Sequence, residues 1–316
     1  MKVIEKIEKS KDTLISFEII PPLRGGDIKM LFGIIDDIIQ YNPPFIDVTS
    51  HSAEVHYEET TEGIRKKVKR KRPGTIGICV AIKNHFKVET VPHLLCHGFT
   101  REETEDALIE LNYLGIENVF AIRGDDRGYK KPIPAGKTHN DYAVELVSQI
   151  SDMNKGKYLE EELLDATPTN FCIGVAGYPE KHFEAPNRKT DIMHLKDKTD
   201  AGAEYIVTQL FFDNKNYFDF VKSCRSIGIK VPVIPGIKIL SLKNHLNSLP
   251  KEFHIDIPDE LTEEVMKAKS EQIIDIGVDW AFKQCEELLN AKVPAIHFYV
   301  LQHSKPIKKL LNKLKI

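Results

Sequence analysis

The sequence predicts a single domain with a (β/α)8 barrel fold over residues 1–316, on three observations. Short apolar segments alternate with amphipathic segments eight times along the chain. The apolar segments are nearly continuous, so both faces of the strands are expected to be covered, as in a parallel sheet. Eight βα units in a chain of roughly this length fit a closed barrel. An open, doubly wound sheet is less favoured, because the chain contains no G-x-G-x-x-G motif.

The expected strands and helices follow one another in chain order. The strands are expected at residues 13–20, 45–50, 74–82, 117–125, 170–179, 204–212, 231–237 and 293–301. The helical segments that follow them are expected at residues 28–41, 57–72, 100–115, 140–153, 190–203, 215–228, 241–250, a longer stretch from Pro258, and 305–316. Thr100 and Glu103 predict a capping box at a helix start, and Gly115 predicts the C-cap of that helix. The charged segment 154–169 is an insertion before the fifth strand, expected to be a surface loop that could serve as a lid.

Composition and charge exclude several classes of protein. The net charge is −3 and the pI about 6.5, so the chain as a whole has no attraction to nucleic acid or to anionic membranes. No apolar run approaches the roughly 18 residues that a transmembrane helix needs. The N-terminal MKVIEKIEKSKD lacks the apolar core of a signal peptide. The five cysteines are scattered and odd in number, which favours reduced thiols in a cytoplasmic protein.

Polar residues gather where the expected strands end. The functional face of a (β/α)8 barrel is built at the C-terminal ends of its strands. The residues at these ends are Glu18, Asp47, Thr49, Arg123, Gly124, Asp125, Gly177, Tyr178, Thr208, Gln209, Pro235, Gly236, His297 and Tyr299. One such residue has little meaning by itself. A hydrogen-bonding side chain or a bare backbone at nearly every strand end predicts an active site.

Glu18 and Asp125 are expected to have different tasks. Glu18 lies in the apolar segment LISFEIIPP, and an ionised carboxylate is seldom buried without a partner. Desolvation should raise the pKa of Glu18 and suit it to donating a proton. Asp125 follows Arg123, whose charge favours the ionised carboxylate and suits Asp125 to stabilising positive charge. The alternative for Glu18 is a structural salt bridge inside the barrel.

Seven segments spread along the chain carry a resemblance to a known family. They are SFEIIPP, PHLLC, AIRGD, GVAGYPEKH, DAGAEYIVTQLFFD, VPVIPGI and HFYVL, in this order from Ser16 to about Leu301. The chain resembles the 5,10-methylenetetrahydrofolate reductases, flavin-dependent barrel enzymes of one-carbon metabolism. The resemblance implies reduction of 5,10-methylenetetrahydrofolate to 5-methyltetrahydrofolate, which supplies methyl groups for methionine synthesis. It also implies FAD at the C-terminal end of the barrel, reduced by NADH or NADPH before the folate takes the same place.

The resemblance also assigns roles residue by residue. Glu18 matches the general acid that helps to protonate N10 of the folate, and Asp125 matches the acidic residue that stabilises the resulting cation. Gln209 matches a residue that contacts the pterin, and His245 stands where some members have a glutamine that touches the substrate. The residues that match FAD-binding positions are Thr49, His93, Arg123, Gly124, Asp125, Tyr142, Ala176, Tyr178, His182, Asp191 and Lys198.

The chain departs from the family pattern at several positions. Ser50 and His51 follow Thr49 where an aromatic residue and a glycine are expected. Leu249 stands where some members have a phenylalanine that stacks on the dinucleotide. His303 stands near a position where many have an arginine that reaches the folate. The sequence therefore leaves open the preference for NADH or NADPH and the contacts to the folate tail.

Three further motifs have structural explanations. The basic run RKKVKRKRP (65–73) resembles a nucleic-acid patch, but glutamates at the start of the expected helix favour a solvated helix face. AGKT (135–138) lacks the upstream glycine that a phosphate-binding loop requires. HLLCH (93–97) offers three residues of metal-ligating type, but no second cluster in sequence completes a tetrahedral set, so no metal is expected. His297 is as well explained by a core histidine as by a ligand contact.

Two other functions are less favoured. The complete set of SFEIIPP and TQLFFD segments argues against another flavin-dependent barrel oxidoreductase, such as a proline dehydrogenase-like enzyme. A weakly negative chain with carboxylates at its strand ends argues against a nucleic-acid-binding protein.

Small molecules are the expected binding partners, and the sequence leaves open whether the chain forms a homo-oligomer. The longer family members carry a C-terminal regulatory domain inhibited by S-adenosylmethionine, and none is expected here because the chain ends soon after the eighth helix.

Overall fold

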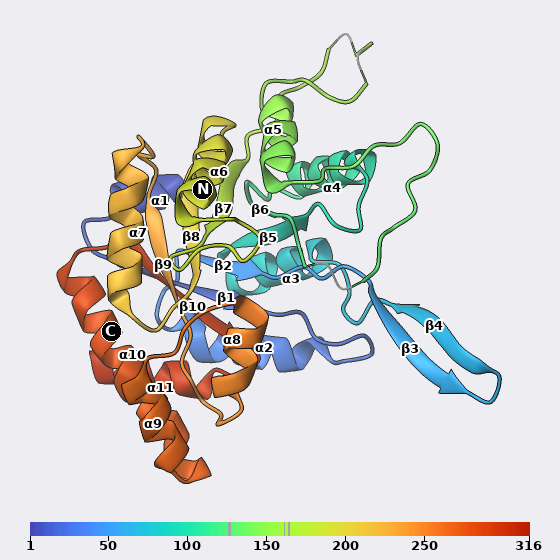
Figure 1. Cartoon of the computed structure of the whole chain (residues 1–316). Coiled ribbons are helices and arrows are strands. Elements are labelled where there is room, and N and C mark those ends of the chain that lie inside the picture. The colour runs from blue at the N-terminus through green and yellow to red at the C-terminus, as the bar shows by residue number, and fades with distance from the viewer. Residues whose placement is uncertain (126–127, 161, 164) are drawn as a thin grey trace.

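The computed structural model in Figure 1 describes residues 1–125, 128–160, 162–163 and 165–316. Eight parallel strands close into a barrel in the order β1-β10-β9-β8-β7-β6-β5-β2, which confirms the predicted fold. The barrel strands are β1 (Leu14–Ile19), β2 (Phe45–Val48), β5 (Glu89–Leu95), β6 (Asn118–Ile122), β7 (Cys172–Gly177), β8 (Tyr205–Leu210), β9 (Val233–Ile237) and β10 (Ala295–Leu301).

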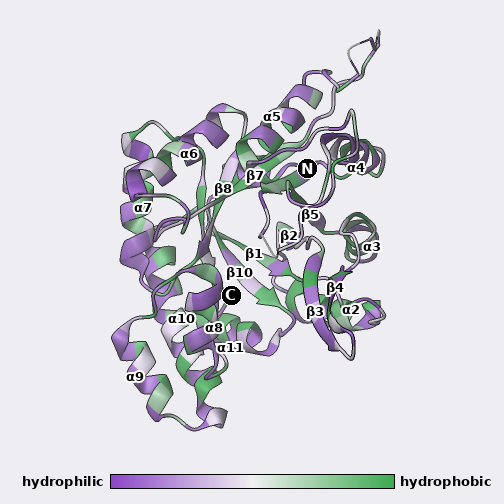
Figure 2. Ribbon diagram, turned by 45° about the vertical axis from the view of Figure 1, so that its right-hand side comes forward, coloured by the Kyte–Doolittle hydropathy of each residue, from purple (hydrophilic) through white to green (hydrophobic). Residues whose placement is uncertain are grey.

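Helices surround the barrel, and in Figure 2 the apolar colour concentrates on the strands and on the helix faces turned toward them. The helices are α1 (Val3–Lys9), α2 (Ile28–Ile39), α3 (Ile76–Phe86), α4 (Arg101–Tyr113), α5 (Ala143–Met153), α6 (Arg188–Asp200), α7 (Asn214–Ser226), α8 (His245–Phe253), α9 (Asp259–Lys267), α10 (Ile273–Asn290) and α11 (Lys305–Leu314), with a 3-10 turn η1 (Ser270–Gln272). The capping box of Thr100 and Glu103 is confirmed, and Gly115, at φ 70°, directly follows the C-cap residue Leu114. In the described ranges, no helix combines the length and apolar character that crossing a membrane would require.

The segment expected to form the second helix is instead an antiparallel hairpin, so the predicted helix over 57–72 is wrong. Strands β3 (Glu54–Thr60) and β4 (Gly63–Lys69) pair in register and extend away from the barrel in Figure 1. The residues alternate as a strand requires, because Val55 faces Val68 while Glu58 binds Lys67 through an ion pair of 2.5 Å. Gly63, at φ 124°, completes a turn that other residues would strain. The basic run is solvated as expected, but it begins on a strand and not on a helix.

The segment expected to form the third strand is also misassigned. Residues 76–86 form helix α3, and β5 takes the place of the third barrel strand. A short apolar run cannot be told from a buried helix by its pattern alone, and in α3 the residues Ile78, Cys79 and Ile82 are buried at helical spacing. β5 contains Pro92, and a proline within a run argues against a strand. The structure accommodates Pro92 beside Val48, and the pairing of β5 with β6 begins after it, at His93.

The barrel interior is apolar at its N-terminal end. The buried side chains of Phe45, Val91, Phe120 and Tyr205 form a cluster there, and helix α1 closes it with Val3 and Ile7. Asn118 anchors this helix, because its Oδ1 accepts a hydrogen bond of 2.7 Å from Val3 N. Successive side chains of a strand point to opposite faces, so a residue two positions further on also points inward. Polar residues occupy these positions. Asp47 comes two residues after Phe45, His93 two after Val91, and His297 two after Ala295.

The charged segment 154–169 joins the end of α5 to the start of β7. It therefore lies at the N-terminal ends of the strands, whereas barrel enzymes bind their substrates at the C-terminal ends. Leu159 N donates to Glu105 on α4 at 2.7 Å, and Tyr158 Oη donates to the Thr167 carbonyl at 2.8 Å. Residues 161 and 164 lie outside the described residues. This position does not favour a lid over the functional face.

Candidate active site

The C-terminal ends of the strands carry two polar regions, which we call the side cavity and the central cluster. The side cavity has a volume of about 420 Å³ and lies between β6, β7, α5 and α6. Its lining residues are Ala121, Ile122, Arg123, Tyr142, Ala143, Val144, Ala176, Tyr178, His182, Glu184, Ala185, Asp191, His194, Asp197 and Lys198. The central cluster lies inside the barrel and consists of Glu18, Asp47, His93 and His297.

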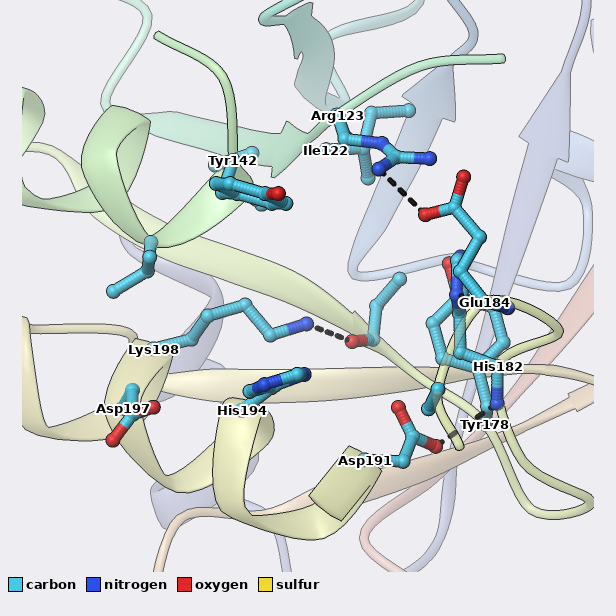
Figure 3. A pocket seen from close by; sticks show the side chains of 15 residues that line it. Ile122, Arg123, Tyr142, Tyr178, His182, Glu184, Asp191, His194, Asp197 and Lys198 are labelled. Carbon is cyan, nitrogen blue, oxygen red and sulfur yellow. Dashed lines mark hydrogen bonds and ion pairs between the residues drawn. The ribbon is translucent and has the colours of Figure 1, made fainter. Parts of the chain in front are cut away.

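Charged side chains of the side cavity already have partners (Figure 3). Arg123, just after β6, places its Nη1 2.6 Å from Glu184 Oε2. Lys198, in the last turn of α6, donates from Nζ to the Ala176 carbonyl at 2.7 Å. The Asp191 carboxylate accepts a hydrogen bond of 3.0 Å from the backbone N–H of His182. A ligand with anionic groups could take over the donors of Arg123 and Lys198.

Burial shapes the charges of the side cavity. It lowers the pKa of Lys198 to about 8, although the charge of Asp191 acts in the opposite direction. Burial also lowers the pKa of His182. The hydrogen bond to Glu184 raises the pKa of Arg123, which therefore stays a cation. Because Lys198 is charged only below about pH 8, the cavity gains positive charge as the pH falls.

The structure brings most of the predicted FAD-binding residues to the side cavity. The predicted residues that line it are Arg123, Tyr142, Ala176, Tyr178, His182, Asp191 and Lys198. His93 lies in the central cluster, while Gly124, at φ 86°, and the exposed Asp125 follow Arg123 beyond the strand. The hydroxyl of Thr49 is buried at the end of β2 without a hydrogen-bond partner among the described residues.

Sequence reasoning missed Glu184 and His194, which also line the side cavity. Neither residue lies at a strand end, where polar residues were sought. Glu184 is also an acid in a site predicted to bind an anion. Its ion pair with Arg123 explains its presence, since it neutralises the guanidinium until a ligand takes that position. The motif GVAGYPEKH ends at His182, two residues before Glu184, and no spacing rule marked Glu184.

The donor set of the side cavity fits FAD. Arg123 and Lys198 can meet a diphosphate, the arginine with a bidentate fork. Ala121 and Ala176 leave an apolar wall without side chains that would fill the space. Tyr142 is 58% exposed and presents its ring to the cavity. Apolar walls with a few convergent polar groups are typical of cofactor sites.

The central cluster places two carboxylates and two imidazoles around one point. His93 Nε2 lies 3.6 Å from Glu18 Oε2 and 3.6 Å from Asp47 Oδ2. His297 Nε2 lies 3.9 Å and 4.0 Å from the same two oxygens. Glu18 is 9% exposed, whereas Asp47 is 1% exposed and His297 fully buried. Glu18 is thus the carboxylate of the cluster that lies nearest to the open face.

This geometry bears on the alternative of a structural salt bridge for Glu18. Among the described residues, the cationic groups within 4.0 Å of the Glu18 carboxylate belong to His93 and His297. Both distances exceed those of a hydrogen bond, and neither partner is a lysine or an arginine. The geometry therefore favours a carboxyl group poised for proton transfer over a tight structural pair.

The substrate residues predicted from the sequence belong to the β8 and β9 units, which follow β7 of the side cavity around the barrel. Gln209, at the end of β8, is half-buried, and its Oε1 accepts a hydrogen bond of 2.9 Å from Leu210 N. Burial and the nearby charge of Lys238 lower the pKa of His245 to about 4. Lys238, which the sequence argument missed, follows β9 and donates from Nζ to the Tyr299 carbonyl at 2.8 Å. Burial lowers the pKa of Lys238 to about 8, opposed by the charge of Glu18.

Gly236 does not offer a bare backbone surface, contrary to the sequence-based expectation. A Cβ at this position would lie 2.7 Å from the Tyr299 ring and 2.3 Å from the Thr208 carbonyl, so the glycine makes room for the tyrosine. Tyr299 Oη donates to that same carbonyl at 2.7 Å, and Thr208 Oγ1 accepts from Gly236 N at 2.9 Å. These contacts make Thr208 and Gly236 supports of Tyr299 and not ligand contacts.

The HLLCH segment divides between two environments. His93 points into the central cluster, whereas Cys96 is buried in the core and burial raises the pKa of its thiol to about 12. The segment therefore does not act as one metal-binding unit. Single atoms of Glu18, Asp47 and His93 lie within 4.8 Å of one another, which is compact enough for the groups to share one positive charge.

Fold and site together define a class of protein: a (β/α)8 barrel enzyme with a side cavity lined by charged residues and a carboxylate–histidine cluster on its C-terminal face. The family model described as methylenetetrahydrofolate reductase matches residues 3–315. The chain belongs to this family, which confirms the resemblance inferred from its motifs.

Relatives with curated names agree with this placement. Methylenetetrahydrofolate reductase (NADH) 1 of Arabidopsis thaliana is 31% identical over 328 residues, covering 99% of this chain and 51% of that protein. The 5,10-methylenetetrahydrofolate reductase of Salmonella typhimurium is 30% identical over 293 residues, covering 92% of this chain and 87% of that protein. The chain thus spans about half the length of the plant relative and most of the bacterial one.

Solved structures with low identity support the fold alone. An uncharacterized protein from Clostridium thermocellum that binds two copies of 5-methyl-5,6,7,8-tetrahydrofolic acid aligns with a TM-score of 0.59 at 13% identity, covering 98% of both chains. An oxaloacetate acetylhydrolase aligns with a TM-score of 0.51 at 8% identity, covering 99% of this chain and 86% of that one.

Proposed function

We propose that this protein is a flavin-dependent 5,10-methylenetetrahydrofolate reductase, which forms 5-methyltetrahydrofolate and so supplies methyl groups for methionine synthesis. The observation that carries the proposal is Glu18, a nearly buried carboxyl group at the C-terminal end of a barrel strand, in a chain that belongs to this family. The relatives' names include both NADH and NADPH as reductants, which supports a nicotinamide co-substrate.

FAD is the proposed cofactor, and the side cavity is its proposed site. Arg123 and Lys198 would hold the diphosphate, and Tyr178 and His182 would line its course. When bound, FAD would supply the redox chemistry, which is hydride transfer from the nicotinamide to the folate in a ping-pong sequence. Thr49, His93, Gly124 and Asp125 would meet the part of the cofactor that reaches toward the barrel axis.

The chain's own residues would govern the folate. Glu18 would donate a proton to N10, and the C–N bond to N10 would break to leave an N5 iminium cation. Asp125 would stabilise that cation by its negative charge, while Gln209 and His245 would position the pterin. The folate bound by the structural relative from Clostridium thermocellum supports a barrel of this type as a folate site.

Three further expectations belong to this proposal. The enzyme would act in the cytoplasm, where folate and nicotinamide substrates are found and where its cysteines would stay reduced. Its partners would be these small molecules, with assembly into a homo-oligomer left as a possibility. The segment 154–169 would be a surface loop of the same single domain.

The first experiment is spectroscopic. Purified protein should be yellow and should release a flavin on denaturation, and its bound flavin should be bleached by NADH or NADPH and restored by 5,10-methylenetetrahydrofolate. A colourless preparation that added FAD does not convert would overturn the proposal. Restoration by a proline-derived substrate in place of the folate would instead favour a proline dehydrogenase-like enzyme.

A further inference from the structure

The central cluster contains several buried polar atoms that lack a hydrogen-bond partner in the described structure. Both carboxylate oxygens of Asp47, Nε2 of His93 and Nε2 of His297 are buried without a hydrogen-bond partner among the described residues. Unpaired buried polar groups are costly, and buried charges are normally paired. These groups therefore must compensate one another within the cluster.

The position of His93 Nε2 decides how this compensation works. The atom lies 3.6 Å from an oxygen of Glu18 and 3.6 Å from an oxygen of Asp47. With Asp47 ionised, a bare lone pair on this nitrogen would face an acceptor at 3.6 Å, which favours a hydrogen on Nε2. Burial opposes a charge on His93, but the carboxylates of Asp47 and Glu18 outweigh it and raise the pKa of His93.

His297 has one ring nitrogen engaged outside the cluster. Its Nδ1 lies 2.8 Å from Ser16 Oγ, and the hydroxyl can donate to this nitrogen. The ring then carries its hydrogen on Nε2, which points toward the oxygens of Asp47 and Glu18. With a hydrogen on each Nε2, both imidazoles direct a donor toward the oxygens of Asp47 and Glu18.

The other groups around His93 leave this assignment in place. Phe120 on β6 packs against the imidazole ring with centroids 4.8 Å apart and adds no charge. Burial raises the pKa of Tyr205 on β8 and of Tyr299 on β10, so both phenols stay neutral. Lys238 beyond β9 interacts with Glu18. Among these described groups, Asp47 is the carboxylate that can pair with His93 when Glu18 holds a proton as the proposed acid.

We propose that His93 and Asp47 are positioning residues for the reaction: Asp47 holds His93 as an imidazolium, and its Nε2–H stabilises the carboxylate that Glu18 becomes when it gives up its proton. The proposal rests on the proposed role of Glu18 as the acid. In this step the O–H bond of Glu18 breaks, the N10–H bond of the folate forms, and the electron pair of the broken bond stays on Glu18. Nothing is oxidised or reduced, and no further reactant is needed.

The direct test is a titration of the histidine side chains by nitrogen-15 NMR in the full-length protein. In the wild type, the His93 midpoint should lie above the ordinary 6.5. In Asp47→Asn it should fall by about one unit or more, since a carboxylate at this distance shifts a neighbour's pKa by about 1–3 units. Asp47→Glu should keep the midpoint high. A wild-type His93 that is neutral at pH 6.5, or a midpoint that Asp47→Asn does not move, would overturn the proposal.

Glu54→Gln provides the matched control, because Glu54 pairs with His56 at 3.1 Å on the β3–β4 hairpin, outside the site. This change should leave His93 untouched. The NMR result does not depend on turnover, so it stands even if the proposed activity fails.

Kinetics supply the second arm. Asp47→Asn should slow the folate half-reaction by roughly 10²-fold, as for loss of one preorganised electrostatic contact, and spare the nicotinamide half-reaction. Asp47→Glu should restore much of the rate. Equal loss in both half-reactions would mark Asp47 as structural. Stoichiometric metal in the purified wild type, lost in Asp47→Asn, would show an ion in place of the proton and would also overturn the proposal.

Discussion

The side cavity and the central cluster lie on the same face of the barrel but hold their charges in opposite ways. In the side cavity, Arg123, Lys198 and Asp191 each have a partner at 3.0 Å or less. In the central cluster, distances between Glu18, Asp47 and the two histidines run from 3.6 to 4.0 Å. Under the proposed function, the first region would exchange partners when FAD binds, and the second would transfer a proton to the folate.

This difference between the two regions predicts that substitutions in the side cavity affect binding and that substitutions in the central cluster affect the reaction rate. A change in the side cavity removes one of several contacts and should reduce affinity by a moderate factor. A change in the central cluster removes a proton donor that the other contacts cannot replace. Variants in the two regions should therefore affect different measurements, and a variant that affects both would break the comparison.

The largest effect is expected for Glu18→Gln. Glutamine has nearly the same size and can still form hydrogen bonds, but it cannot donate the proton to N10. The folate half-reaction should fall by roughly 10²–10⁴-fold, while reduction of the flavin by the nicotinamide should continue near its normal rate. Stopped-flow flavin absorbance with each substrate in turn measures the two rates separately.

A thermal melt of the same variant completes this test. If Glu18 were half of a buried structural pair, removing its charge would cost about 3–5 kcal/mol of stability, and the melt would fall together with the activity. A normal melt with a selective loss of folate reduction supports the acid. Near-normal folate reduction would return Glu18 to a structural role.

The next largest effect is expected for Lys198→Met, which keeps an unbranched side chain of similar length and removes its charge. A charge-assisted hydrogen bond contributes about 1.5–3 kcal/mol, so FAD affinity should fall by roughly 10–100-fold. Lys196→Met is the matched control, because Lys196 lies on the same helix and pairs with Asp200 at the surface. Fluorescence titration of the flavin-free protein measures both affinities. Equal effects of the two changes would remove Lys198 from the site.

The lowered pKa of Lys198 also predicts that FAD binding depends on pH. Its pKa in the free protein is lowered to about 8, so the ammonium is present below that pH and is lost above it. A bound diphosphate favours the ammonium and raises the pKa again. FAD affinity should therefore fall as the pH rises above about 8. Lys198→Met should flatten this fall, and an unchanged pH dependence in the variant would count against the assignment.

A smaller effect is expected for Asp125→Asn. Positive charge develops on the folate as its ring opens, and a carboxylate stabilises this charge better than an amide does. Asp125 is exposed, so solvent screens its charge, and the folate half-reaction should slow by about tenfold, with FAD still bound. Asp36→Asn, at an exposed site on α2, should have no effect. Equal slowing of the nicotinamide half-reaction would contradict the role.

The secondary structure could be predicted from the sequence where a segment carried a single hydrophobic pattern. The strands β6, β7, β8 and β10 are continuous apolar runs with clear boundaries, and they lie where the sequence placed them. The second and third units failed because two patterns competed. Residues 57–69 have the charge pattern of a helix and the alternation of a hairpin, and pairing between Val55 and Val68 decides in favour of the hairpin. β5 was not predicted because it contains Pro92, and a proline argues against a strand.

The error at β5 also explains what was missed in the site. Because β5 was not recognised as a strand, no strand end placed His93 beside Glu18, and His93 was marked only by the family resemblance and by the HLLCH motif. Asp47 and His297 were seen as polar strand residues, but their meeting depends on barrel register, such as Glu18 opposite Asp47. Glu184 and Lys238 lie in loops, where sequence periodicity carries no information on position.

The smallest effect is expected for Gln209→Ala, and this variant sharpens the comparison because Gln209 belongs to neither region. Its amide, half-buried at the end of β8, can pair with a donor and an acceptor on the edge of a pterin. In this structure its Oε1 accepts from Leu210 N at 2.9 Å, so part of the amide is already engaged and the net gain on binding is reduced. One neutral hydrogen bond contributes about 0.5–1.5 kcal/mol, so folate affinity should fall by between about twofold and tenfold.

The Gln209→Ala change should leave FAD affinity and the nicotinamide half-reaction unchanged. Gln40→Ala, at the end of α2, is the control, since Gln40 donates a local hydrogen bond to the Asp37 carbonyl, away from the site. Equilibrium titration with a folate that cannot react measures the affinity without the chemistry. Folate affinity equal to that of the wild type would remove Gln209 from the substrate site, and a loss of FAD affinity would place it in the side cavity's network instead.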